Sequence, residues 1–367
     1  MKLPSFSVLE KEQRAVYFED LDESLLVVGP PGSGKTSMAL WRARRLATMT
    51  PPKRVVLVTR NRLLAAVASR LALEEGGCSI ESMTMHKFFT TEYSGRFGHF
   101  APTAGFQFRW PQILATYEHA NVRPALDHLV VDEGQNLPPQ FFIWARKYGA
   151  RAVSVFADEF QTTDDNGSQV ADLKAAGFTN VKPLLINYRN TQEIVDFVSQ
   201  FHVDRRLPKP PASRGSSGER PRLLVVQTWA DLVQAVSTRL ANRGGSIGVI
   251  VYERNEVLFL AGLFKKALGA VRVDHYVSKL PAGAEHAIRM QEEGVTIISG
   301  ESATGLEFDA VFLQDLSRSL PSTAALQKRR LYTFSARARD SLFLINGPVA
   351  LSAAQLADLP SRPLLEP

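Results

Sequence analysis

Residues 25–36 combine an apolar run, a glycine-rich loop, a lysine and a threonine at a spacing that suits phosphate binding. Gly29, Gly34, Lys35 and Thr36 fit the pattern G-x-x-x-x-G-K-[ST], between an expected buried strand and an expected helix. Glycines let backbone N–H groups face phosphates, and the start of a helix adds further N–H donors. The residues expected to surround the phosphates are Gly29, Pro30, Pro31, Gly32, Ser33, Gly34, Lys35 and Thr36.

Two side chains of this loop have distinct expected roles. Lys35 is expected to reach the β- and γ-phosphates of a nucleoside triphosphate, and the Thr36 hydroxyl to hold Mg²⁺. Outside a strand–loop–helix context the same residues would form an ordinary glycine turn. That context is present here, so the sequence predicts ATP and Mg²⁺ as ligands.

A pair of carboxylates, Asp132 and Glu133, follows the apolar run 126–131. Asp132, at the end of an expected strand, is a candidate Mg²⁺ ligand, and Glu133 is a candidate base for the attacking water. Two acids at a strand end are commonly solvated turn residues. The phosphate loop upstream favours the chemical interpretation.

The elements that must position these residues alternate between strands and helices along the whole chain, which predicts a doubly wound α/β architecture. A short helix is expected over Ser7–Tyr17, capped by Ser7, and it carries Gln13, whose amide could read adenine. Residues 92–109 are aromatic, glycine-rich and show no regular pattern. The expected strands are 25–28, 54–59, 80–85, 126–131, 152–157, 181–186, 222–227, 247–251, 295–299, 310–313 and 341–345.

The length of 367 residues suits two domains, and 45% hydrophobic residues suit globular ones. We expect an N-terminal ATPase domain over 1–184, a second domain over 185–350 and a tail over 351–367. The net charge of +6 is compatible with a polyanionic partner and equally with a solvated basic surface. The single cysteine, Cys78, excludes a disulfide within the chain. No apolar run reaches membrane-spanning length and no signal stretch is evident, so a cytoplasmic protein without membrane contact is expected.

The order of these motifs resembles that of the UvrD/Rep/PcrA-type superfamily 1 helicases, from about Leu9 to about Leu344. Each motif is modest alone, but their common order is specific. The resemblance rests on residues 9–13, 29–36, 59–61, 84–88, 131–135, 156–161, 187–189, 304–308 and 331–339.

The resemblance implies two RecA-like P-loop NTPase-type domains with mostly parallel sheets and ATP in the cleft between them. It implies that the chain hydrolyses ATP with Mg²⁺ and acts on single-stranded nucleic acid, DNA or RNA. The implied roles are adenine recognition by Gln13, sensing of the γ-phosphate by Gln161, adenine stacking by Tyr188, ribose binding by Glu307, and charge neutralisation by Arg189 and Arg337 as arginine fingers.

The sequence departs from that family on the nucleic-acid side. The stretch 274–294, before the G-L-E-F motif, is too short for the large insertion of the helicases. The tyrosine and tryptophan that follow the sensing glutamine in the family are missing after Gln161. Glu301 and Thr304 stand where the family has histidine and lysine. Base stacking must therefore be weaker or built elsewhere; Phe88, Trp110 and Phe160 are candidates, with a place in the core as the alternative.

Two functions remain open on the sequence. The first is an ATP-dependent motor that translocates on or remodels a single strand, with a protein partner supplying the missing modules. The second is an ATP-gated switch subunit of a DNA repair or phage-defence complex with weak or no unwinding activity. A nucleotide-binding scaffold without catalysis is disfavoured, because every residue expected to take part in hydrolysis is present.

Overall fold

The computed structural model describes residues 3–74, 79–158, 167–203, 209–314 and 316–367. The chain divides into two compact units. The first unit comprises Leu3–Gly29 and Gly34–Leu184, and the second comprises Pro30–Ser33 and Leu185–Pro367. Gln161 and the other calls on 159–166, and also Cys78, lie outside the described residues.

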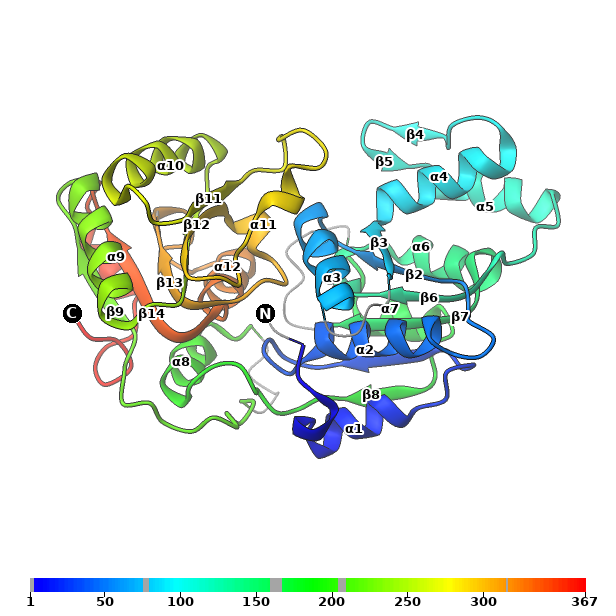
Figure 1. Cartoon of the computed structure of the whole chain (residues 1–367), viewed down its shortest axis with the longest axis horizontal. Helices are drawn as coiled ribbons and strands as arrows, with labels where there is room; N and C mark the ends of the chain where they lie inside the picture. Colours follow the sequence, from blue (N-terminus) through cyan, green and yellow to red (C-terminus); the bar gives the residue numbers. More distant parts are fainter. Residues whose placement is uncertain (1–2, 75–78, 159–166, 204–208, 315) are drawn as a thin grey trace. The chain divides into compact units, whose positions relative to one another are not determined.

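The first unit is built on a six-stranded sheet of order β3-β2-β6-β7-β1-β8 (Figure 1). All of its strand pairs are parallel, which requires crossover connections and apolar strands that are buried on both faces. Parallel order also brings the carboxyl ends of all six strands to one edge. The strands are β1 Leu25–Val28, β2 Val55–Thr59, β3 Glu81–Thr84, β6 Leu126–Val131, β7 Ala150–Ala157 and β8 Val181–Pro183.

Helices and one small hairpin complete the first unit. The hairpin pairs β4 Thr103–Ala104 with β5 Gln107–Phe108 and lies beside α4 in Figure 1. Aromatic side chains join the helices near it; the Phe89 and Trp144 rings, for example, meet edge-on at 4.9 Å. The helices are α1 Lys11–Phe18, α2 Lys35–Ala47, α3 Arg62–Glu74, α4 Met85–Phe97, α5 Trp110–His119, α6 Pro139–Trp144 and α7 Val170–Ala175, with 3-10 turns at Phe6–Val8 and Gly134–Asn136 and a π turn at Ala145–Gly149.

The second unit contains another six-stranded parallel sheet, of order β11-β12-β10-β13-β14-β9 (Figure 1). Its strands are β9 Arg222–Val225, β10 Ser246–Val251, β11 Val273–Tyr276, β12 Gly294–Ser299, β13 Phe308–Leu313 and β14 Ala338–Asn346. Its helices are α8 Gln192–Val198, α9 Trp229–Arg243, α10 Arg254–Leu268, α11 Gly300–Ala303, α12 Ala325–Ser335 and α13 Ala353–Ala357, with 3-10 turns at Ser199–Phe201, Ala284–Ala287 and Leu316–Arg318. The predicted α/β class with two mostly parallel sheets is confirmed.

Two local expectations were wrong. The first helix begins at Lys11 rather than Ser7, because the backbone N–H of Glu10 donates to Gln13 Oε1 at 3.2 Å and makes Glu10 the N-cap. The stretch expected to be irregular instead continues α4 to Phe97 and then forms the β4–β5 hairpin. Among the described residues, no helix has the length and apolar character needed to cross a bilayer.

Candidate nucleotide site

The phosphate loop connects β1 to α2, and glycine is required at the point where the helix starts. Gly34, the N-cap of α2, has φ +89°, a conformation that side chains other than glycine rarely adopt. A Cβ atom built there would lie 2.4 Å from Nε2 of Gln13. The Gln13 side chain, 5% exposed, is therefore held beside the loop, where a base-reading amide was expected.

Lys35 is the first residue of α2 and its side chain is buried. Its Nζ donates to the Gly29 carbonyl oxygen at 2.7 Å and lies 3.2 Å from Oδ2 of Asp158. Asp158 directly follows β7, the strand beside β1, and is 1% exposed. A buried lysine side chain is thus paired with a buried carboxylate at the carboxyl edge of the sheet, which holds the lysine extended toward the loop.

Asp132 follows β6 at the same edge and is 1% exposed. Neither of its carboxylate oxygens has a partner in normal hydrogen-bond geometry among the described residues, although the Thr36 hydroxyl lies near enough to affect it. Burial and the Glu133 carboxylate raise the pKa of Asp132, and Thr36 and Lys35 oppose the rise. A buried, unsatisfied carboxylate is costly, and a divalent cation with oxygen ligands satisfies it. Asp132 and Thr36 therefore fit Mg²⁺.

Glu133 has left-handed backbone geometry, φ 56° and ψ 39°, which is unusual for a residue other than glycine. Such a conformation costs about 1–3 kcal/mol and is often found at functional sites. The Glu133 carboxylate accepts a hydrogen bond from Gln135 Nε2 at 2.6 Å, and Gln135 Oε1 accepts one from the Asp158 N–H at 2.9 Å. Gln135 thereby ties the end of β6 to the end of β7 and orients the candidate base.

Asp158 and Gln135 were given no role on the sequence. Asp158 pairs with the phosphate-loop lysine, and Gln135 holds Glu133. A signal did exist for Asp158, because it is the first polar residue after an apolar strand, as Asp132 is. What the sequence could not show was that β7 is adjacent to β1.

The second unit brings together three motifs that are far apart in the chain. Arg189 Nε lies 2.6 Å from Oε2 of Glu307, and both side chains are largely buried. Burial alone would raise the pKa of Glu307, but the Arg189 guanidinium contributes to lowering it to about 2. Tyr188, the preceding residue, is half-buried. The ion pair therefore joins the expected arginine finger to the expected ribose ligand.

Arg337 continues this chain of contacts. Its side chain is 2% exposed, and it donates to the carbonyl oxygens of Thr333 at 2.9 Å and Leu306 at 3.3 Å. It therefore ties the end of α12 to the residue that precedes Glu307. The nearby Asn190 Nδ2 donates to the Ala336 carbonyl oxygen at 3.1 Å. The roles of Arg189 and Arg337 as arginine fingers stay predictions.

The first unit thus gathers Gln13, Lys35, Thr36, Asp132 and Glu133 in one region, and the second gathers Arg189, Glu307 and Arg337. Within the described part of the chain, no group of three or more His, Cys, Asp or Glu side chains could hold a metal by itself. A cation at Asp132 would therefore need further ligands, such as the Thr36 hydroxyl and phosphate oxygens.

Residues 12–164 match the family model of the AAA domain. The match contains Gln13, the phosphate loop and both candidate carboxylates, and it supports a nucleotide-binding P-loop character for this region. No curated protein matches the chain. One similar solved structure is the C-terminal domain of "a possible DNA helicase" from Lactobacillus plantarum WCFS1. Its sequence is 22% identical to this one, the alignment covers 49% of this chain and 97% of that chain, and the TM-score is 0.35.

Proposed function

We propose that this chain is an ATP-hydrolysing, helicase-like motor that translocates on or remodels single-stranded nucleic acid with a protein partner. The observation that carries the proposal is the carboxyl edge of the first sheet. There a phosphate loop, a buried lysine and the unsatisfied carboxylate of Asp132 lie together. The match of 12–164 to an AAA domain supports the same chemistry, and the order of motifs along the sequence supports the helicase-like class.

Each nucleotide-site residue of the first unit has a specific role in this proposal. Lys35, now paired with Asp158, would bind the β- and γ-phosphates. Asp132 and Thr36 would hold Mg²⁺, which offsets phosphate charge when it is bound. Glu133, oriented by the Gln135 amide, would accept the proton of the attacking water at its carboxylate. Water attack on the γ-phosphorus would release ADP and inorganic phosphate.

The second unit would supply positive charge and nucleotide contacts. Arg189 and Arg337 would stabilise the negative charge that develops on the transferred phosphoryl group. Glu307 would bind the ribose, and Tyr188 would stack on adenine. The Arg189–Glu307 ion pair links these two roles. A substitution at either residue would therefore affect both ribose binding and charge stabilisation.

A second candidate is the ATP-gated switch with weak or no unwinding. It is favoured by a polar pocket of about 420 Å³ in the second unit, which Glu301 lines together with several cations. Glu301 Oε2 lies 3.8 Å from the Arg254 guanidinium, and Glu253 pairs with Arg318. Acids that neutralise cations in this pocket weaken the attraction for a phosphate backbone.

The deciding experiment measures ATP hydrolysis by the full chain with and without single-stranded oligonucleotides. Glu133→Gln is expected to lower the rate by about 10²–10⁴-fold, because the base is removed while its shape is kept. Glu118→Gln, at an exposed position on α5, is the matched control and should retain the wild-type rate. Strong stimulation by a single strand supports the motor, whereas indifference to nucleic acid supports the switch. Equal rates for wild type and Glu133→Gln would refute both.

A further inference from the structure

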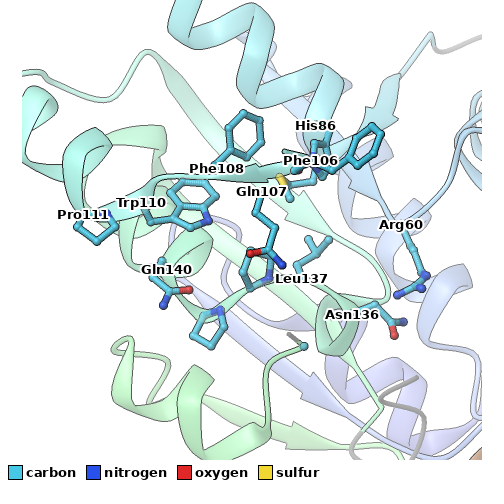
Figure 2. Close-up of a pocket in the computed structure, with 14 residues that line it drawn as sticks. Arg60, His86, Phe106, Gln107, Phe108, Trp110, Pro111, Asn136, Leu137 and Gln140 are labelled. Atoms are coloured by element: carbon cyan, nitrogen blue, oxygen red, sulfur yellow. The ribbon is translucent and has the colours of Figure 1, made fainter. Parts of the chain in front are cut away.

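The first unit contains a pocket of about 730 Å³ that none of the described nucleotide-site residues lines (Figure 2). Its walls come from the residues that follow β2 and β3, from the β4–β5 hairpin and the start of α5, and from residues 136–140, which lead into α6. Ligands of open α/β sheets bind outside the carboxyl ends of the strands, and this volume is typical of a small-molecule or single-base site. The residues that matter here are Arg60, His86, Phe106, Gln107, Asn136 and Gln140.

The β4–β5 hairpin exposes one aromatic ring to solvent and packs another against α4. Phe106, in the two-residue turn after Gly105, is 95% exposed. Phe108 instead packs on Phe89 at 4.7 Å and stacks on His86 at 5.0 Å. His86 Nε2 also lies 3.0 Å from the Phe106 carbonyl oxygen, to which it donates. The Phe106 ring is therefore displayed on an anchored turn.

The pocket combines aromatic, amide and cationic groups. Figure 2 shows Gln107 directed between Trp110 and Leu137, with Gln140 on the Trp110 side of the pocket and Asn136 on the Arg60 side. Side-chain amides both donate and accept, as is needed to read the edge of a base. Arg60 is a lining cation, and none of the lining residues that the structure describes is Asp or Glu.

We propose that this pocket binds a nucleobase of a single strand, with Phe106 as the stacking platform and Arg60 facing the phosphate backbone. The proposal rests on the proposed function and deepens it by placing the strand on the first unit. It accounts for the aromatic residues that are missing after Gln161: the stacking surface lies on the hairpin instead. The Arg60 cation beside an exposed aromatic ring favours a strand with phosphates and bases over a peptide.

The pocket is also connected to the nucleotide site. The 3-10 turn Gly134–Asn136 begins directly after Glu133, and its last residue, Asn136, lines the pocket. Gln135, between them, bonds to Glu133 and to the Asp158 backbone. A base that moves Asn136 would thus reach the candidate catalytic base through two residues.

The test compares Phe106→Ala with Phe100→Ala in the full chain. Phe100 is 80% exposed and does not line the pocket, so it is a matched loss of an exposed ring. Binding of fluorescein-labelled oligo(dT) and oligo(rU) is followed by anisotropy. Loss of one stacking contact of about 1–3 kcal/mol predicts a Kd about 5- to 150-fold higher for Phe106→Ala. Phe106→Trp should restore affinity, and Phe100→Ala should bind and hydrolyse as wild type does.

Photo-crosslinking provides an independent measurement. A strand that carries iododeoxyuridine should form its adduct within residues 97–109, at Phe106. If Phe106→Ala binds the oligonucleotides with unchanged affinity, or if the adduct maps elsewhere, the proposal is overturned. The pocket would then be a candidate site for a protein ligand. The Glu133→Gln comparison reports separately on hydrolysis, so an active ATPase with unchanged Phe106→Ala binding refutes only the pocket. A wild type without strand binding refutes both the pocket and the motor.

Discussion

His128 provides a test of the first unit's interior through the pH dependence of its stability. It lies on β6 with no exposed surface, and its Nε2 is 2.8 Å from Ser154 Oγ on β7. Arg42 Nε donates to the same oxygen at 2.6 Å. Because an arginine can only donate, the Ser154 hydroxyl hydrogen is not used by Arg42 and is available to His128 Nε2. A His128 that accepts this hydrogen at Nε2 is neutral, which agrees with the direction in which its pKa is shifted.

The sign of the effect follows from the pKa. Burial first, and then the charges of Arg42 and Lys53, lower the pKa of His128 to about 3, while the Leu21 backbone opposes them. The unfolded chain binds the proton near pH 6.5. Stability that is fully present above pH 6.5 is therefore lost as the pH falls toward 3. The loss at pH 5 is about 2 kcal/mol, from 1.36 kcal/mol for each pH unit below the unfolded pKa.

The perturbation is His128→Gln, whose amide oxygen can accept the Ser154 hydroxyl but cannot titrate. Urea unfolding of both proteins between pH 7.5 and 5 is followed by tryptophan fluorescence, which reports mainly on the first unit through Trp41, Trp110 and Trp144. The wild type should lose about 2 kcal/mol more than the variant across this range. His119→Gln, at an exposed position of the same unit, should follow the wild-type curve. Parallel curves for wild type and His128→Gln would show that the histidine is not held neutral.

Two further predictions concern buried charges. Arg42→Met should lower the free energy of unfolding by about 1–3 kcal/mol, because the carbonyls before β1 that its guanidinium bonds lose their donor. Arg44→Met, on the same helix, removes a cation–π contact with the Trp41 ring and should cost less than about 1 kcal/mol in the same urea titration. Arg189→Met alone should destabilise the second unit more than the double variant Arg189→Met/Glu307→Gln does, because the single variant leaves the Glu307 carboxylate without its cation. A double-mutant cycle should give a coupling free energy of about 0.5–3 kcal/mol. Additive effects of the two substitutions would contradict the ion pair.

The strongest parts of the sequence prediction were those set by local spacing. A phosphate loop needs its strand, glycines, lysine and helix within twelve residues, so the pattern 25–36 predicted the β1–α2 unit. The alternation of apolar strands with helices likewise predicted two parallel sheets, because parallel strands require crossovers. Local capping was less secure: Ser7 is the residue type that favours an N-cap, but the Gln13 side chain bonds the Glu10 N–H and the helix begins at Lys11.

The hairpin at 103–108 shows where a single-sequence pattern fails. Its strands are two residues each, too short for a period-2 pattern, and its turn is Gly-Phe. What holds it is the contact of Phe108 with Phe89 and His86 on α4, which a local pattern cannot reveal. Trp110, one of the candidate stacking residues, is buried in the core, whereas Phe106 in the hairpin turn is exposed.

By itself, the sequence determined that a triphosphate-binding loop and a pair of strand-end acids belong to an α/β chain, because those residues act through neighbours a few positions away. Only the tertiary structure decided which residues meet across strands. Asp158 faces Lys35 because β7 lies beside β1, and Arg189 pairs with Glu307 because loops more than a hundred residues apart converge. Strand order depends on the packing of the whole sheet, so it cannot be read from the spacing of residues within one element.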